Sequence, residues 1–333
     1  MAAGSIDILG IGNAIVDVVA TADDDFLVRE KLNKGGMTLI DEPRAQQLYG
    51  SMGAGTVISG GSAANTIVGV ASFGLSSAFI GKVKADETGA AFTHDIRAMK
   101  VRFETPHAKD GPSTARCLVL VTPDGERTMN TYLGACQNLT PADVDENLVR
   151  SAGITYLEGY LWDPPEAKKA FVKAAEVAHA AGNKVALTLS DAFCVDRYRA
   201  EFLDLIRSRT VDIIFANQHE LRSLYETADF DTAVSALREE GILAAVTRSE
   251  LGSLVVSREQ TYAVPAYPIE KLVDTTGAGD LYAAGFLSGL ARGASLEDCA
   301  RLGALAASEI IQHYGARPVV RLSDLASQNG LSY

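Results

Sequence analysis

The 333-residue sequence lacks several features that would define other classes of protein. It has no apolar run of the length that crosses a membrane, and its N-terminus lacks the basic start and apolar core of a signal peptide. We therefore expect a cytoplasmic protein that has no membrane partner. Its four cysteines are widely spaced without a CxxC pattern, and its five histidines show no zinc-binding spacing. Reduced, buried thiols are expected.

Two nucleotide-binding fingerprints are also missing. No GxxxxGK[ST] motif occurs, which excludes a P-loop enzyme. The run Gly10-Ile11-Gly12 has Ile15 where a dinucleotide-binding turn needs its third glycine.

Positive charge is scarce, since 30 Lys and Arg residues face 42 Asp and Glu residues, for a net charge of −12. The overall field would repel polyanions, so nucleic acid is not an expected partner. A site for a phosphate-bearing substrate must therefore be built locally, from backbone amides, a few basic side chains and a metal ion.

Short β-rich runs alternate with amphipathic stretches through most of the chain. This alternation predicts the α/β class, with a mostly parallel central sheet flanked by helices on both faces. The expected strands are 6–11, 57–59, 77–80, 154–157, 185–189, 213–216, 243–247 and 254–257. The expected helices are 63–73, 87–99, 165–181, 200–207, 220–225, 231–240, 278–291 and 296–313.

Two strand-like stretches interrupt this rhythm. Residues 16–37 mix alternating apolar residues with acidic ones, and two strands, 115–122 and 128–133, flank a turn that contains Asp124-Gly125. Asp-Gly between alternating runs predicts a hairpin. We interpret both stretches as one small sheet, a candidate lid. The expected domains are 15–40 with 113–135 for the lid, and 1–14, 41–112 and 136–333 for the large domain.

The segment Asp274–Asp280 reads DTTGAGD and precedes an apolar, helix-forming stretch. Gly277 and Gly279 flank Ala278, so the backbone can turn sharply and approach a ligand closely. The unpaired amides and positive dipole end of a helix beginning here favour a phosphate. Asp280 then has two interpretations. It either favours the helix start only, or accepts the proton of an attacking hydroxyl beside the anion hole.

Two further polar sites follow expected strands. Gly60-Gly61-Ser62 precedes a helix that bears Asn65 in its first turns, and Gly12-Asn13 ends the first strand shortly before Asp17. The Asn65 amide and the Asp17 carboxylate suit a polyhydroxylated substrate, because they can bond its hydroxyls. From the residues alone, a local cap for Asn65 and a solvated acid for Asp17 explain them as well.

A fourth site, Asn217-Gln218-His219-Glu220, directly follows a buried strand. Ligands of open parallel sheets collect at the carboxyl ends of the strands. An amide and a carboxylate there suit Mg²⁺ bound through water, since this ion keeps much of its hydration. The alternative is that Glu220 only stabilises a helix start.

In this order, the motifs resemble the PfkB (ribokinase-like) family of carbohydrate and nucleoside kinases. Its hallmarks are a Gly-Gly motif with a following Asn, Asn-x-x-Glu, and a terminal Asp-Thr-x-Gly-Ala-Gly-Asp, all present between about residues 6 and 318. The resemblance implies a ribokinase-like three-layer fold with a β-sheet lid, and transfer of the γ-phosphoryl group of ATP with Mg²⁺. Monomer and homodimer both stay open.

Within the family, the stretches 26–40 and 126–135 are similar to adenosine kinases, which makes the 5′-hydroxyl of a nucleoside, above all adenosine, the expected acceptor. A free sugar (ribose, fructose or a ketodeoxy sugar acid) is the alternative, and a binding module without catalysis is another. One departure is Ser249, where the family often has glycine before its nucleotide loop.

The resemblance also implies roles for individual residues. Asp280 would be the base, Gly277, Ala278 and Gly279 the anion hole, and Arg127 a contact to the transferred phosphate. Substrate contacts would be Asn13, Asp17, Gly61, Ser62 and Asn65, with Trp162 and Phe193 as candidate base-stacking residues. ATP would meet Asn217, Thr247, Gly252, Gly277 and Gly279, and Mg²⁺ would meet Asn217 and Glu220. A K⁺ ion would bind near Asp274, Thr276 and Ser308.

Overall fold

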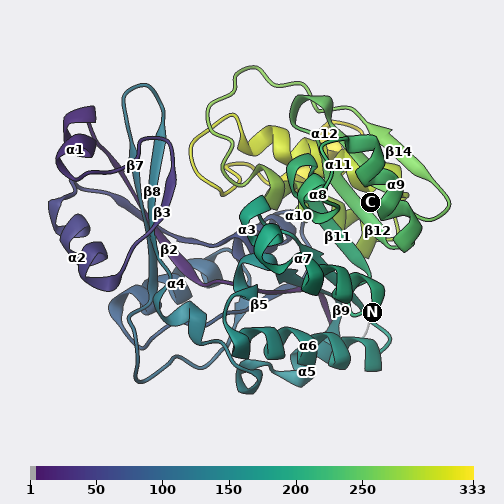
Figure 1. Ribbon diagram of the computed structural model, residues 1–333, viewed down its shortest axis with the longest axis horizontal. Coiled ribbons are helices and arrows are strands. Elements are labelled where there is room, and N and C mark those ends of the chain that lie inside the picture. The colour runs from purple at the N-terminus through teal and green to yellow at the C-terminus, as the bar shows by residue number, and fades with distance from the viewer. Residues whose placement is uncertain (1–4) are drawn as a thin grey trace.

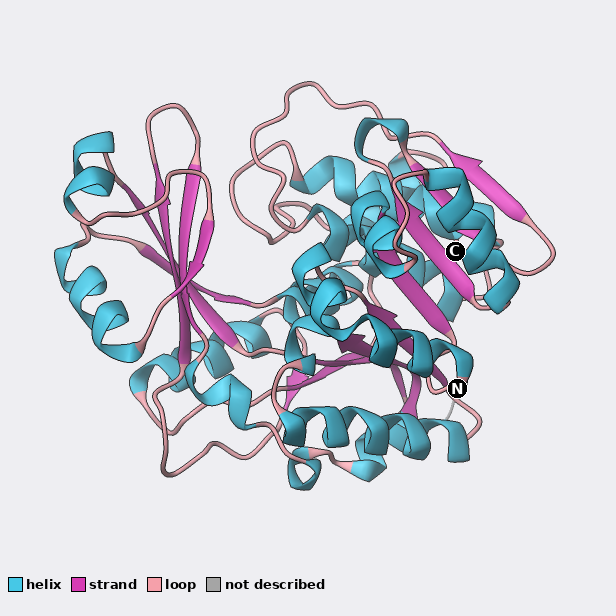
Figure 2. Cartoon of the chain, viewed as in Figure 1, coloured by secondary structure: helices cyan, strands magenta, loops and turns pink. Residues whose placement is uncertain are grey.

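Nine strands form the large sheet in the computed structural model, which describes residues 5–333 (Figures 1 and 2). Their order is β14-β13-β12-β11-β10-β9-β1-β5-β6. The strands from β6 to β12 pair in parallel, and β13 and β14 add an antiparallel edge. The predicted α/β class is confirmed. The strands are β1 Ile6–Ile11, β5 Ser77–Ile80, β6 Arg102–Phe103, β9 Ala152–Glu158, β10 Lys184–Thr188, β11 Ile213–Asn217, β12 Leu243–Thr247, β13 Ser253–Val256 and β14 Thr261–Val264.

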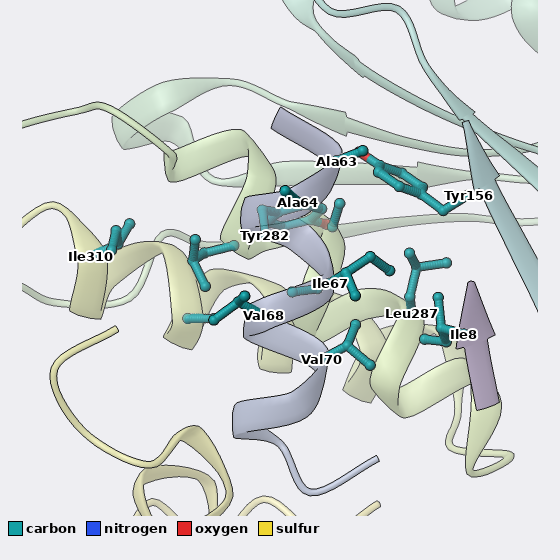
Figure 3. Close-up of a cluster of buried hydrophobic side chains, with 14 of the residues drawn as sticks. Ile8, Ala63, Ala64, Ile67, Val68, Val70, Tyr156, Tyr282, Leu287 and Ile310 are labelled. Carbon is teal, nitrogen blue, oxygen red and sulfur yellow. The ribbon is translucent and has the colours of Figure 1, made fainter. Parts of the chain in front are cut away.

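Helices cover both faces of this sheet. Because successive strand residues point to opposite sides, they pack against different helical layers. Ile8 joins one buried cluster and Leu9 the other. Figure 3 shows the first cluster, in which the side chains of helix α3 pack beside the helix that bears Leu287 and the strand that bears Ile8. The helices of that cluster beside the large sheet are α3 Ser62–Ser72, α4 Glu87–Ala98, α10 Ala278–Ala291, α11 Leu296–Ile310 and α12 Leu322–Gln328. Those of the second are α5 Glu146–Ser151, α6 Pro165–Ala180, α7 Ala192–Arg207, α8 Gln218–Leu224 and α9 Phe230–Glu240.

A second sheet of five strands stands apart from the large sheet, on the left of Figure 1. Its order is β3-β8-β7-β2-β4, and β7 and β8 form the expected hairpin. The sheet also includes β4, which the sequence placed in the large domain; it pairs antiparallel with β2. The strands are β2 Ile15–Thr21, β3 Met37–Leu39, β4 Thr56–Gly60, β7 Ala115–Val121 and β8 Arg127–Tyr132.

The two faces of this small sheet differ. Val18 and Leu118 belong to its packed face, in the same buried cluster as Phe26 of α1 (Asp24–Arg29) and Leu48 of α2 (Glu42–Ser51). The opposite face carries Asp17, and the strand register places several partners on that face. These partners are Met37, Leu39, Ile58, Cys117, Arg127, Met129 and Thr131.

Other expectations need correction at their boundaries. Helix α7 starts at Ala192 rather than at residue 200, and α11 ends at Ile310 rather than at residue 313. Residues 24–29 are helical inside a stretch that was expected to be strand-like. All four cysteines are buried and free, and no helix within residues 5–333 is long and apolar enough to span a membrane.

Candidate active site

The carboxyl ends of the parallel strands meet at one edge of the large sheet, where ligands of open α/β folds bind. Asn13 follows β1 by two positions, while Glu158 is the last residue of β9 and Asn217 the last of β11. Two of the sequence-predicted polar sites therefore start from this edge, and Glu158 adds an acid that was not predicted.

Helix α10 begins at the same place with a glycine turn. Gly277 has φ 80°, the left-handed region that favours glycine, and an added Cβ there would lie 2.9 Å from Cβ of Ala316. The first bond closing a full helical turn runs from the Leu281 N–H to the Gly277 carbonyl, at 2.8 Å. The amides of Gly279 and Asp280 precede that bond and lie at the positive end of the helix dipole. This turn can therefore bind an anion.

Asp280 is held by two side chains of α3. Ser62 Oγ donates to its Oδ1 at 2.6 Å, and Asn65 Nδ2 donates to its Oδ2 at 3.0 Å. Burial raises the pKa of Asp280, while the bonds from Ser62 and Asn65 and the charge of Arg317 oppose that rise. The structure thus joins two motifs that are more than 200 positions apart in the sequence.

Asp17 reaches the same region from the small sheet. Burial raises its pKa to about 6; Arg317 and Arg127 lower that pKa, and Asp280 raises it further. Its carboxylate lies against Gly60, where an added Cβ would be 2.4 Å from Asp17 Oδ2. Gly61 has φ 98°, and a Cβ there would lie 2.1 Å from the Asn13 carbonyl oxygen. Both glycines are therefore needed where these segments meet.

Glu158 is the buried acid that the sequence analysis missed. It is 1% exposed and accepts hydrogen bonds from Asn13 Nδ2 at 2.7 Å and from the Ala63 amide at 2.9 Å. Burial raises its pKa to about 7, against the effect of these donors. The Asn13 amide group thus points to Glu158. The only signal in the sequence was the position of this acid, directly after the buried run 154–157.

Arg127 connects the small sheet to the glycine turn through an ion pair with Asp274, and both side chains are at most 9% exposed. The same Asp274 carboxylate accepts from the Thr276 amide at 3.0 Å and the Gly315 amide at 3.1 Å. The hydroxyl of Ser308 donates to the Leu305 carbonyl at 2.7 Å. Asp274 already has three partners, and the K⁺ site expected here stays a prediction.

Asn217 and Glu220 form a reciprocal cap at the start of α8. Asn217 Oδ1 accepts from the Glu220 amide at 2.9 Å, and the Glu220 carboxylate accepts from the backbone and side-chain amides of Asn217 at 2.9 and 2.5 Å. Burial raises the pKa of Glu220 to about 7, and the charge of Asp191 raises it further. Residues 5–333 hold no cluster of three metal-ligating side chains. A buried carboxylate that is coupled to a second acid suits Mg²⁺ held through water, and Mg²⁺ binding here stays a prediction.

The two aromatic residues expected to stack on a base differ in their burial. Trp162 is 4% exposed in the core beside Phe171 and Phe202, and its Nε1 donates to Glu201 at 2.8 Å. It is a core residue, so that expectation was wrong, because an apolar ring near a strand end has the same pattern in either role. Phe193 is 80% exposed in the first turn of α7, and its stacking on a base stays a prediction.

The expected ATP residues lie at a neighbouring strand. Thr247 is the last residue of β12, and Gly252 directly precedes β13. Gly252 has φ 81°, and a Cβ there would lie 2.1 Å from the Val264 carbonyl oxygen. The glycine is required by packing between β13 and β14, whatever it contributes to nucleotide binding. Their contact with ATP stays a prediction.

Comparisons with known proteins agree with this architecture. The family model described as pfkB family carbohydrate kinase matches residues 40–321. The chain therefore belongs to the pfkB family of carbohydrate kinases, and it is a phosphotransferase with an alcohol group as acceptor. It is 30% identical to adenosine kinase 2 of Arabidopsis thaliana, with 92% of this chain and 94% of the relative covered.

Two solved structures are more similar. The crystal structure of adenosine kinase from Sinorhizobium meliloti is 54% identical and has a TM-score of 0.91, covering 98% of this chain and 100% of that one. A probable sugar kinase from Rhizobium etli is 51% identical with a TM-score of 0.92, covering 98% of this chain and 99% of that one. Both matches span nearly the whole fold, and one of these proteins is an adenosine kinase whereas the other is a probable sugar kinase.

Proposed function

We propose that this protein transfers the γ-phosphoryl group of ATP to the 5′-hydroxyl of a nucleoside, in particular adenosine. The observation on which the proposal rests is the fixed position of Asp280 in the first turn of α10, with Ser62 and Asn65 each bonded to one of its oxygens. A carboxylate beside a helix N-terminus brings together a proton acceptor and donors for the charge on a phosphoryl group. The similarity to the adenosine kinase of Sinorhizobium meliloti supports the nucleoside acceptor.

In the proposed reaction, Asp280 accepts the proton of the attacking 5′-hydroxyl. The hydroxyl oxygen bonds to the γ-phosphorus while the bond from that phosphorus to the bridging oxygen breaks, which leaves ADP. The two hydrogen bonds on Asp280 fix its orientation, and the free amides at Gly279 and Asp280 lie where the transferred phosphate would gain charge. Asn217 and Glu220 would hold Mg²⁺ through water, and the ion would offset charge on the phosphates of ATP.

The open face of the small sheet supports a nucleoside over a free sugar. On the face that carries Asp17, Met37 is 50% exposed and Leu39 is 55% exposed. Met129 is half-buried beside them, opposite Met37. An apolar surface on the same sheet face as a hydroxyl-binding acid suits a ligand with one polar and one flat apolar part. We infer that the small sheet acts as a lid over the nucleobase of the substrate, and closure of this lid would also exclude water.

The experiment that tests this function measures ADP release with ATP and Mg²⁺ over a panel of nucleosides and free sugars. We expect turnover with adenosine and much weaker turnover with ribose or fructose. Turnover with free sugars alone would replace the nucleoside by a sugar. Ligand binding without turnover of any acceptor would contradict catalysis.

A further inference from the structure

Arg317 lies after α11 and binds the chain on both sides of Gly60-Gly61. These two glycines form the joint between the two sheets. Its Nε and Nη2 donate to the Ser59 carbonyl at 3.1 and 2.6 Å, and Nη2 also donates to Ser59 Oγ at 2.9 Å. Its Nη1 donates to the Ala64 carbonyl at 2.9 Å. A planar guanidinium can donate in several fixed directions at once, which a lysine ammonium on a flexible stem does not reproduce.

Ser59 and Ala64 stand on either side of Gly60-Gly61. Ser59 belongs to β4 of the small sheet, and Ala64 belongs to α3, which packs against the large sheet. The Ser59 side is anchored a second time, since its amide and its hydroxyl both donate to Asp95 Oδ2, at 2.8 and 2.5 Å. Arg317 therefore connects β4, an edge strand of the small sheet, to the first turn of α3, which packs on the large sheet.

Two acids of the candidate site, Asp17 and Asp280, depend on this joint for their positions. Gly60 lies against the Asp17 carboxylate, and Ser62 and Asn65, just beyond the joint, hold Asp280. A displacement of the joint would move both acids relative to each other. A misplacement of about 1 Å in an active site can cost on the order of 10²-fold in rate.

The charge of Arg317 also reaches the two acids. Burial lowers the pKa of Arg317 to about 10, so it keeps its charge near neutral pH, and Asp95, Asp17 and Asp280 favour that charge. In return, Arg317 lowers the pKa of Asp17 and of Asp280. The other titratable groups whose charges are coupled to these acids are Arg127 and Cys117 for Asp17, and Tyr156, Glu158 and Tyr160 for Asp280.

We propose that Arg317 is a positioning residue, which clamps the Gly60-Gly61 joint from both sides and supplies the positive charge shared by Asp17 and Asp280. The inference rests on the proposed role of Asp280 as the base, but it does not depend on which acceptor the enzyme uses. No step of the reaction passes through Arg317 itself.

The test compares Arg317→Gln and Arg317→Lys with the matched control Arg321→Gln, whose arginine is exposed four positions further along. With Arg317→Gln, we expect kcat to fall on the order of 10²-fold. The acid limb of the pH–rate profile should move to higher pH, because the base loses the charge that keeps it ionised. Arg317→Lys should keep the acid limb near that of the unaltered enzyme while kcat still falls, since the charge remains and the clamp is lost. Arg321→Gln should change neither.

One further readout separates positioning from a loss of folding. Guanidinium ion at millimolar concentration should restore part of kcat in Arg317→Gln and leave Arg321→Gln unaffected. If Arg317→Gln does not fold, the acid limb and kcat of Arg317→Lys decide alone. An unshifted acid limb in Arg317→Gln, or an unchanged kcat in folded Arg317→Lys, would overturn the inference. All assays use the acceptor that the unaltered enzyme phosphorylates, so a wrong acceptor would show in the substrate panel and not here.

Discussion

The large and small sheets differ in how many of their faces are packed. The large sheet has a buried helical layer on each side, whereas the small sheet packs one face against α1 and α2 and leaves the other open beside Asp17 (Figure 1). The acid proposed as the catalytic base, Asp280, lies in helix α10, which packs on the large sheet, whereas the exposed apolar residues Met37 and Leu39 lie on the small sheet. This difference suggests that the large sheet fixes the reacting groups while the small sheet selects the acceptor.

The largest expected effect is a loss of kcat, and it tests whether the large sheet fixes the reacting groups. Asp280→Asn should lower kcat by at least about 10²-fold, the lower range for positioned acid–base catalysis, because an amide cannot take the hydroxyl proton. Substrate binding, measured by calorimetry, should survive. Asp298→Asn is the matched control, since Asp298 occupies the first turn of the neighbouring helix α11. Equal, small losses in both variants would reduce Asp280 to a helix-start residue.

A smaller effect, on KM for the nucleoside, is expected from substitutions on the small sheet. Replacing Met37 and Leu39 together by Ser should raise KM for the nucleoside roughly 10-fold, since loss of about 1.4 kcal/mol of apolar burial weakens binding by that factor. The kcat should change little. Val28→Ser is the control, because Val28 is 76% exposed on α1, away from the open face. An unchanged KM for the nucleoside would break the proposed division of roles between the sheets.

The smallest effect concerns stability at the sheet edge. Burial raises the pKa of Glu158 to about 7 from 4.5, so its stabilising contribution is complete below pH 4.5 and is lost as the pH rises through about 7. Glu158→Gln does not titrate there. The Tm of the unaltered protein relative to this variant should therefore fall by a few degrees from pH 5 to pH 8. The exposed Glu259→Gln should show no such trend, and a relative Tm that rises with pH would contradict the raised pKa of the buried Glu158.

Much of the fold could be predicted from the sequence, because strand and helix periodicities are local. The parallel strands, the hairpin around Asp124-Gly125 and the helix after Gly277 all follow from neighbouring residues. The failures concern contacts between distant segments. The partner of β4 is β2, almost 40 positions earlier, and the burial of Trp162 depends on Phe202 from another helix.

The candidate site divides in the same way. Asp280, Asn65 and Asp17 could be selected by type and by their place after strands or at helix starts. Glu158 and Arg317 could not be given roles, because an isolated acid and an arginine in a tail have no local pattern that distinguishes them from solvated residues. Their partners, Asn13 and Ser59, lie 145 and 258 positions away.

By itself, the sequence determined the α/β alternation, the glycine turn at residues 277–279 and the scarcity of positive charge, since these depend on composition and on spacings of a few residues. Only the tertiary structure decided which polar groups meet. Ser62 and Asn65 bind Asp280 because α3 and α10 pack on the same face of the large sheet, and Arg317 reaches Ser59 because the chain returns there after α11. Such meetings depend on how whole elements pack, which no local pattern of residues encodes.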